Sequence, residues 1–412
     1  MAWESDTDIL MISQYYRPET IGSGPFCADL AEALAASGKQ VKVITARPHY
    51  PGNVVFPAYR GGLRDRQFIN RVEIRRLPVV ARGGDSFLSR LANEGSLFLG
   101  ATAALTRDRA RDAPMIVVLC PSILSVMLGN VIRRRNARCV AIVHDIQSGI
   151  AEGLGMGGRL LVKALKLIER TTFNRCDLVV VLSEEMRRTL RNQGIGCPIE
   201  VHPIWIDTEA IRPQPTTSGP ARTALYSGNF GRKQGLLQLV DLAQELHGRG
   251  SPLRVRLRGR GNQEEAVRRE VRSRGLRNVE FRDLIGPEEL ADGLAEGDIH
   301  LVPQDPSIAD YAVPSKIYGI MAAGRPFVAT ARRDSTLWHL REESGAFLCV
   351  PPNDIDAFAN AVMELAENAD WRAELGRHGR NYVLRNCARN VSLRRLIGRI
   401  ARNGAPYELP VG

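Results

Sequence analysis

The chain has 412 residues, a length that fits two domains of about 200 residues each better than one ordinary core. Its net charge is +11, from 56 basic and 45 acidic residues, and arginine supplies nearly all of the excess. Such a surplus favours an anionic partner but does not choose among a nucleic acid, an acidic membrane surface and a phosphorylated substrate. A genomic base composition that enriches arginine explains the same excess without any function.

Cysteine usage and the N-terminus indicate the compartment. The seven cysteines are scattered and never form a C-x-x-C pair, which predicts reduced, mostly buried thiols. The opening sequence MAWESDTDILMIS contains an apolar run that is too short for a signal peptide or a spanning helix. We therefore expect a cytoplasmic protein.

Short apolar runs alternate with amphipathic sequence along the chain. DILMIS, VKVIT, MIVVLC, RCVAIVHD and DLVVVLS are rich in β-branched residues, and TALYSG, LRVRLRG, NVEFRD, DIHLVPQ and FVAT repeat the pattern further on. This alternation predicts an α/β protein with two Rossmann-like, doubly wound parallel sheets. We expect an N-terminal domain over residues 1–210, a Pro- and Ser-rich linker over 211–223, a second domain over 224–380, and a C-terminal helix over 381–412 that packs back toward the first domain. The carboxyl ends of both sheets would then surround one central cleft.

One region of the first half is strongly basic. The sequence YRGGLRDRQFINRVEIRRLPVVAR, which includes Arg75, Arg76 and Arg82, leads directly into the weakly charged helical sequence SFLSRLANEGSLFLGATAALTR. A basic patch beside an apolar helix is typical of proteins that adsorb to anionic lipid. The alternative is a buried crossover helix beside a solvated hairpin.

Candidate site residues of the first half follow predicted strands. Gly22 and Gly24 precede a helix that we expect to start near Pro25, and they let the backbone pass close to a bulky or anionic group. The spacing is not G-x-G-x-x-G, which disfavours a nicotinamide enzyme. His144 and Asp145 end a strand, where ligands bind in open α/β folds, although such a pair is often structural. His49 also follows a strand and is a candidate for the same opening.

In the second half, YSGNFGRKQG follows a strand and combines small residues with two cations. Backbone amides together with Arg232 and Lys233 would make a diphosphate cradle. A further glycine pair, Gly259 and Gly261, follows the next strand, and neither pair has Walker spacing. An Asp-x-Asp at positions 6–8 precedes the first strand, away from the expected cleft, and no His or Cys cluster has zinc spacing, so we expect no metal.

The segment YAVPSKIYGIMAAGRPFVA, residues 311–329, places a single lysine at the start of a helix that is poor in charge. Ser315 and Lys316 precede the small residues Ala322, Ala323 and Gly324.

Six pieces of the sequence, in order along nearly the whole chain, carry a family resemblance: QYYRPETIGSGP, TARPHYPG, IVHDIQ, YSGNFGRKQG, VPSKIYGIMAAGRPFVA and the terminal W-x-x-x-L-G helix. Together they resemble glycosyltransferase family 4 of the GT-B fold, and in particular the bacterial colanic-acid, exopolysaccharide and O-antigen enzymes. The resemblance implies a retaining, metal-independent transfer of sugar from a nucleotide-diphosphate donor to an acceptor bound by the first domain.

The resemblance also implies roles for residues. His144, Arg232 and Lys233 would be catalytic, with His144 on the donor sugar and the two cations on the diphosphate. The donor-binding residues would be Gly22, Gly24, Ser227, Gly228, Asn229, Gly259, Ser315, Lys316 and Gly324. The residues facing the acceptor and the membrane would be His49, Arg75, Arg76 and Arg82.

Two positions depart from the family pattern. Asn229 stands where the family has an arginine, and Arg232 is the candidate to replace that arginine. The family's paired glutamates would fall on Tyr311 and Gly319, neither of which is acidic. A carboxylate role therefore does not transfer to this chain, and Ser315 and Lys316 become the expected donor contacts. The resemblance then implies that the segment 311–329 forms the donor-side wall of the cleft, with Ser315 and Lys316 meeting a diphosphate and the small residues packing beneath.

These observations lead to one principal hypothesis and two alternatives. The principal one is a transferase, resting peripherally on the inner face of the cytoplasmic membrane, that extends a polyprenyl-diphosphate-linked glycan from a nucleotide sugar. An epimerase of nucleotide sugars at C2 shares the fold and the donor but has no reason to carry an acceptor face. A nucleic-acid-binding protein would account for the charge, but no recognisable module is present and the aromatic content is 6%.

Overall fold

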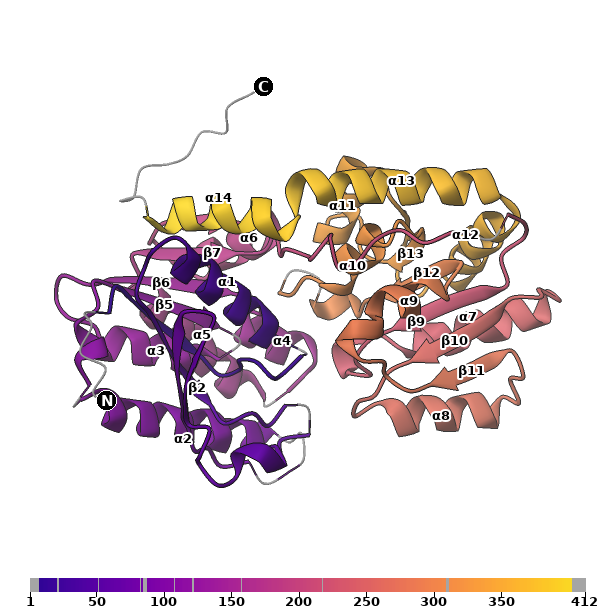
Figure 1. The fold of residues 1–412 in the computed structure, drawn as a ribbon. Coiled ribbons are helices and arrows are strands. Elements are labelled where there is room, and N and C mark those ends of the chain that lie inside the picture. The colour runs from indigo at the N-terminus through magenta and orange to yellow at the C-terminus, as the bar shows by residue number, and fades with distance from the viewer. Residues whose placement is uncertain are drawn as a thin grey trace. The chain divides into compact units, whose positions relative to one another are not determined.

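A computed structural model describes residues 7–20, 22–50, 52–81, 83, 87–106, 108–120, 122–156, 158–216, 218–308 and 311–401. These residues form two compact units (Figure 1). The first unit holds the described residues up to Glu152, those from 158 to His202, and those from Leu393 onward. The second unit holds Gly153–Met156 and Pro203–Ser392.

The first unit is built on an eight-stranded sheet in the order β3-β4-β2-β1-β5-β6-β7-β8. Its strands are β1 (Ile9–Ser13), β2 (Val41–Ala46), β3 (Arg66–Ile69), β4 (Val72–Leu77), β5 (Met115–Cys120), β6 (Arg138–Val143), β7 (Leu178–Val181) and β8 (Ile199–Val201). All neighbouring strands are parallel except the β3/β4 hairpin at one edge. The strand order reverses between β1 and β5, and this switch point is where ligands bind in open α/β sheets.

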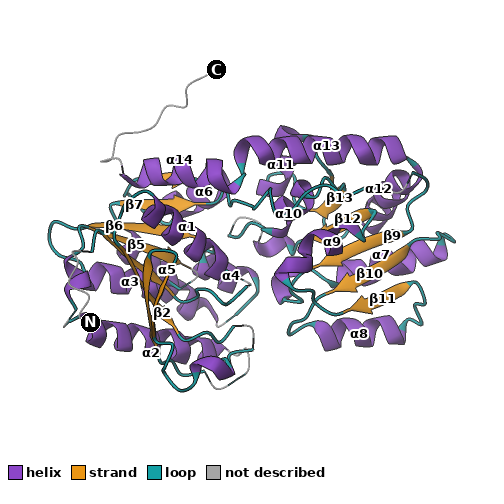
Figure 2. Cartoon of the chain, in the orientation of Figure 1, coloured by secondary structure: helices purple, strands orange, loops and turns teal. Residues whose placement is uncertain are grey.

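Helices connect these strands and cover the sheet (Figure 2). They are α1 (Gly24–Ala36), α2 (Phe87–Leu105), α3 (Ile123–Ile132), α4 (Gln147–Gly153), α5 (Gly158–Phe173) and α6 (Glu184–Asn192), with short turns η1 (Pro57–Tyr59) and η2 (Arg109–Asp112). Helix α1 begins beside Pro25, as predicted from its sequence. Helix α6 begins at Ser183, whose hydroxyl accepts the backbone N–H of Met186 at 3.2 Å and satisfies a free donor of the first turn.

The second unit has a six-stranded parallel sheet in the order β11-β10-β9-β12-β13-β14. Its strands are β9 (Thr223–Ser227), β10 (Arg254–Arg258), β11 (Val279–Arg282), β12 (Ile299–Pro303), β13 (Phe327–Thr330) and β14 (Leu348–Val350). The order reverses between β9 and β12, so a second switch point lies at the carboxyl end of β9.

The helices of this unit are α7 (Leu237–Gly248), α8 (Glu264–Ser273), α9 (Leu290–Ala295), α10 (Lys316–Ala322), α11 (Thr336–Ser344), α12 (Ile355–Glu367) and α13 (Ala369–Asn386), with short turns η3 (Arg232–Gln234), η4 (Pro287–Glu289) and η5 (Pro306–Ile308). Helix α14 (Arg389–Ala401) starts in the second unit and ends in the first. Two side chains cap these helices: Asp354 accepts the N–H of Ala357, and Asn368 accepts that of Trp371, each at 2.9 Å.

Both cores follow from continuous apolar strands. Every residue of β1, β2, β7, β12 and β13 is buried, as expected for parallel strands covered by helices on both faces. The two parallel-sheet α/β units match the predicted fold class.

The chain crosses from the first unit to the second before it reaches the Pro- and Ser-rich segment 211–223, which we expected to be the linker. The change falls between His202 and Pro203, and the described residues of 211–223 belong to the second unit. Three arginines donate to carbonyl groups of this segment: Arg325 to Pro215, Arg372 to Gly219, and Arg380 to Ile211. Arg380 also donates to the carbonyl of Thr208, just before the segment. Part of the arginine excess therefore acts as internal structure and not as a charged surface.

Candidate active site

The switch point of the second sheet gathers several of the predicted donor residues. Strand β9 ends at Ser227, and Gly228 and Asn229 follow it with partly or fully exposed surfaces. The N–H of Gly228 donates to the carbonyl of Arg258 at 3.0 Å, and that of Phe230 donates to Arg260 at 2.9 Å. The turn after β9 is thus fixed to the turn after β10.

Lys316 brings its amine to this turn from the first residue of α10. A side-chain carbon at position 228 would lie 3.1 Å from Lys316 Nζ, so a side chain larger than that of glycine would press on the amine. The amine is buried and has no hydrogen-bond partner among the described residues. Burial lowers the pKa of Lys316 to about 7, because an ammonium away from water loses its hydration.

Tyr226 lies directly under this amine. Lys316 Nζ is 3.8 Å from the centre of the tyrosine ring, a cation–π distance, and the Tyr226 hydroxyl donates to the carbonyl of Asn229 at 2.7 Å. The Tyr226 side chain is fully buried, and burial raises its pKa. One aromatic residue therefore touches both the lysine and the turn after β9.

The other predicted donor residues lie in different surroundings. Arg232 and Lys233 form the short turn η3, which precedes α7, and the Arg232 side chain is exposed. They do not stand at the N-terminus of α7, which begins at Leu237. Ser315 is exposed beside Lys316 and makes no capping bond with α10.

Gly259 and Gly324 are explained by packing. A side-chain carbon on Gly259 would lie 2.0 Å from the carbonyl oxygen of Gly228, so this glycine is needed for the two turns to meet. Gly324 follows the carboxyl end of α10, opposite the end that carries Lys316. It adopts a φ of +65° there and lies against Pro213 and Gly376. The structure therefore does not place Gly324 with the lysine.

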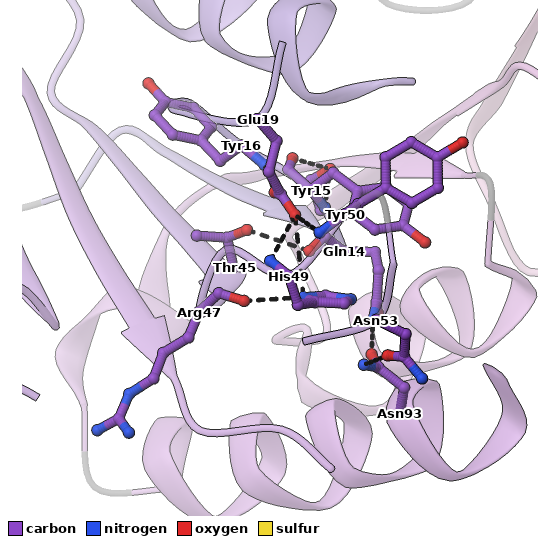
Figure 3. Close-up of polar contacts among 11 residues, drawn as sticks. Gln14, Tyr15, Tyr16, Glu19, Thr45, Arg47, His49, Tyr50, Asn53 and Asn93 are labelled. Atoms are coloured by element: carbon purple, nitrogen blue, oxygen red, sulfur yellow. Dashed lines mark hydrogen bonds and ion pairs between the residues drawn. The ribbon is translucent and has the colours of Figure 1, made fainter. Parts of the chain in front are cut away.

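At the carboxyl edge of the first sheet, a buried carboxylate joins two loops (Figure 3). Glu19 lies in the loop after β1, and its Oε1 accepts the backbone N–H groups of His49 and Tyr50, both at 2.9 Å, from the loop after β2. Its Oε2 accepts the N–H of Tyr16 at 3.1 Å. Burial raises the pKa of Glu19 to about 7, against the opposing effect of these three N–H groups.

Glu19 also accounts for Gly24, one of the two predicted loop glycines. A side-chain carbon on Gly24 would lie 3.0 Å from the Glu19 carbonyl oxygen, so close packing within the loop explains this glycine. Gly22 has a φ of +76° and faces the ring of Tyr50.

His49 is buried beneath this arrangement, where it cannot meet a membrane. Its Nδ1 is 2.8 Å from the carbonyl of Arg47 and acts there as the donor, which leaves Nε2 as an acceptor. Burial lowers the pKa of His49. The half-buried ring of Tyr15 lies 5.5 Å from the His49 ring and 5.2 Å from the ring of Tyr50.

A chain of amide side chains completes this edge of the sheet. Gln14 donates to Asn93 of α2, Asn93 donates to Asn53 at 3.0 Å, and Asn53 donates to Ser89 at 2.6 Å. Gln14 is buried, and its Oε1 has no partner among the described residues.

His144 follows β6 as predicted, with its backbone N–H bonded to the carbonyl of Cys120 at 3.1 Å. The ring of Phe26, from α1, meets its ring edge-on at 5.5 Å between centres. Burial lowers the pKa of His144 to about 4, so its imidazole is neutral at physiological pH. A neutral ring at this position can exchange hydrogen bonds with hydroxyl groups.

The expectation that Arg76 faces anionic lipid is wrong, whereas the Arg75 side chain is 21% exposed and engaged in an ion pair. Arg75 pairs with Asp108 at 2.8 Å, and Asp108 also binds Lys42 at 3.0 Å. Arg76 is 2% exposed, donates to Gln67 at 2.6 Å and to the carbonyl of Arg17 at 2.8 Å, and has its pKa lowered by burial. The side chains of β4 alternate between the two faces of the sheet, and Arg76 falls on the buried face together with Val72 and Ile74. The sequence pattern of arginines did not show this. Arg82 lies outside the described residues.

Sequence reasoning assigned no role to Glu19 or Tyr226, although both lie in motifs that carry the family resemblance, QYYRPETIGSGP and YSGNFGRKQG. Glu19 is a single acidic residue in a loop rich in tyrosine and glycine, and nothing in the sequence shows that its carboxylate turns inward. Tyr226 is the one aromatic residue in TALYS, where it is indistinguishable from an ordinary core residue. Their roles depend on contacts between segments far apart in the chain.

The described part of the chain offers neither a metal site nor a spanning helix. Within it, no group of three or more His, Cys, Asp or Glu side chains is placed to hold a metal ion. None of its helices combines the length and the apolarity that crossing a bilayer requires. All seven cysteines are free thiols.

Comparisons with known proteins agree with this architecture. Residues 22–205 match the model of the glycosyl transferase 4-like domain, and residues 221–368 match that of glycosyl transferases group 1. The chain is 29% identical over 374 residues to the Escherichia coli K12 glycosyl transferase WcaI, whose name assigns it to colanic acid biosynthesis, with 86% of this chain and 91% of WcaI covered.

Solved structures show the same fold. The sucrose-phosphate synthase of Thermosynechococcus elongatus superposes with a TM-score of 0.77 at 19% identity, covering 95% of this chain and 98% of the synthase. Anabaena Alr3699/HepE, solved in complex with UDP and glucose, gives a TM-score of 0.70 at 14% identity over 96% of this chain and 99% of its own. The chain belongs to the GT-B glycosyltransferases built from these two domains, as its motifs predict.

Proposed function

We propose that the chain transfers a sugar from a nucleotide-diphosphate donor to a growing cell-surface polysaccharide, with retention of anomeric configuration and without a metal. The observation that carries this proposal is the buried amine of Lys316, which has no partner among the described residues and lies beside Gly228 at a sheet switch point. A diphosphate is an anion that would supply this amine with the partner that it lacks among the described residues. The UDP in the HepE complex supports a nucleotide sugar as donor.

In the transfer, a hydroxyl oxygen of the acceptor forms a bond to the anomeric carbon as the bond from that carbon to the diphosphate oxygen breaks. The proton of the hydroxyl passes to the leaving diphosphate, on which negative charge builds. Lys316 would stabilise that charge, and the diphosphate would raise the pKa of the amine above about 7 and hold it protonated. Arg232, exposed on η3, is a further candidate to meet the diphosphate.

The remaining residues would act on sugars. His144 is neutral and follows β6, so it suits a hydrogen bond to a hydroxyl of the donor sugar. Tyr15 and Tyr50 are half-buried, and their rings offer aromatic surface that suits the C–H face of an acceptor sugar, while the buried His49 ring packs against Tyr15. The similarity to WcaI supports a polysaccharide as the product.

We also propose that the acceptor is linked to a polyprenyl diphosphate and that the first unit rests on the inner face of the membrane. With Arg75 and Arg76 engaged internally, the surface that supports this idea is the β3/β4 hairpin. Leu63 before the hairpin is 96% exposed, Phe68 is 53% exposed, and Arg66 and Arg71 are exposed beside them. Apolar side chains among arginines suit an anionic lipid surface.

A donor screen followed by a transfer assay tests the proposal. Thermal unfolding is measured with UDP-, GDP-, ADP- and dTDP-sugars, and binding of one class raises the unfolding temperature. The chosen donor is then incubated alone and with a polyprenyl-diphosphate-linked sugar. We expect transfer only when the acceptor is present. A donor sugar that changes configuration without acceptor would identify an epimerase instead.

A further inference from the structure

The contacts around Lys316 assign a role to Tyr226, a residue of β9 that lies beneath the predicted diphosphate site. Lys316 belongs to α10, and no carboxylate or other hydrogen-bond acceptor among the described residues fixes its amine. The amine instead meets the face of the Tyr226 ring, whose centre is 3.8 Å from Nζ. The negative face of an aromatic ring attracts a cation more strongly where water is excluded.

Tyr226 makes a second contact with the same site. Its hydroxyl donates to the carbonyl of Asn229 at 2.7 Å and thereby fixes the turn 228–231, whose Gly228 borders the lysine amine. The buried Phe230, from the same turn, packs with its ring centre 5.8 Å from that of Tyr226. The tyrosine therefore fixes the position of the Lys316 amine relative to the turn.

We propose that Tyr226 is a positioning residue for donor binding. Its ring holds the Lys316 amine at the switch point, and its hydroxyl holds the turn after β9. It does not touch the donor and acts through these two groups. This inference rests on the proposed binding of a diphosphate by Lys316 and gives a role to Tyr226, the first residue of the YSGNFGRKQG motif, to which the family resemblance assigned none.

A double-mutant cycle on nucleotide affinity tests the role. The affinity of the purified full chain for UDP, GDP and ADP is measured by calorimetry, and the tightest of these diphosphates is kept as the probe. Tyr226→Leu removes the ring, whereas Tyr226→Phe keeps the ring and loses only the hydroxyl. We expect Tyr226→Leu to weaken binding by about tenfold and Tyr226→Phe to recover most of that loss.

The same two substitutions are then made together with Lys316→Met. If Tyr226 acts through the lysine, Leu and Phe at position 226 should differ by less than about twofold when the lysine is absent. Equal losses with and without the lysine would show an ordinary core residue and overturn the inference. An unchanged affinity in Lys316→Met would instead contradict the proposed diphosphate site, and a chain that binds none of the three nucleotides would contradict the nucleotide donor itself.

A measurement on the unsubstituted protein covers the case in which Tyr226→Leu does not fold. The side-chain methylene next to Nζ of Lys316 gives a proton–carbon NMR signal that is assigned by its loss in Lys316→Met. An amine seated on the Tyr226 ring experiences the ring current, so the signal should lie upfield of ordinary lysines and move when the diphosphate probe is added. A signal at the ordinary lysine position in the free protein would contradict the proposed contact between the amine and the Tyr226 ring.

Discussion

The carboxylate of Glu19 accepts the backbone N–H of His49 at 2.9 Å, and this bond ties the loop after β1 to the loop after β2. The same carboxylate accepts two more N–H groups, from Tyr50 and Tyr16. An unsatisfied buried N–H costs about 1–3 kcal/mol, so the arrangement of both loops depends on this one side chain.

Replacing Glu19 should therefore destabilise the fold in a graded way. Glu19→Ala leaves three N–H groups without their acceptor and should lower the free energy of unfolding by about 3 kcal/mol, which urea unfolding measures. Glu19→Gln keeps one carbonyl oxygen for His49 and Tyr50 and should lose about 1 kcal/mol. Equal stability of Glu19→Ala and the unsubstituted chain would contradict this account of the loops.

Burial of the Lys316 amine should make stability depend on pH. The pKa of this amine is about 7 in the folded protein against an ordinary value of 10.5, so between these values the unfolded chain binds more protons. Stability from this group is therefore lowest below pH 7 and rises with pH up to about 10.5. Lys316→Met lacks this dependence.

Urea unfolding at pH 7, 8 and 9 checks the sign. Lys316→Met should exceed the unsubstituted chain in stability most at pH 7, and its advantage should shrink by up to about 1.4 kcal/mol for each pH unit. A difference that stays constant over this range would show that the amine is hydrated and not buried.

His144 should contribute as a neutral group. Because its pKa is lowered to about 4, the rate of sugar transfer should show no step from this residue between pH 5 and 8. His144→Ala should lower kcat by about a hundredfold, and His144→Gln should restore part of the loss. Exposed His378 is the control, and His378→Ala should leave the rate unchanged. A transfer rate that His144→Ala leaves intact would remove this residue from the site.

The β3/β4 hairpin should govern adsorption to lipid. Leu63→Ser combined with Phe68→Ser should reduce co-sedimentation with phosphatidylglycerol vesicles several-fold, because these side chains are exposed among arginines. Leu160, which is 83% exposed on α5, is the matched control. If Leu160→Ser reduces sedimentation as much as the hairpin variant, the hairpin is not the surface that binds lipid.

The sequence predicted the fold well because parallel strands buried on both faces leave continuous apolar runs, as in MIVVLC and DLVVVLS. It also predicted both Lys316 and the turn after β9 as donor contacts, and in the structure the Lys316 amine lies beside Gly228 of that turn. The surroundings of individual side chains were not predictable. Arg76 turns into the interior, Gly259 serves a contact between turns, and Glu19 binds a distant loop.

The central claim is that Lys316 binds the diphosphate of a nucleotide donor. Calorimetry on the unsubstituted chain and on Lys316→Met, with the best-binding nucleoside diphosphate and its monophosphate, tests it most directly. We predict that the unsubstituted chain prefers the diphosphate by at least about tenfold and that Lys316→Met loses most of this preference. An undiminished preference in Lys316→Met would contradict the claim.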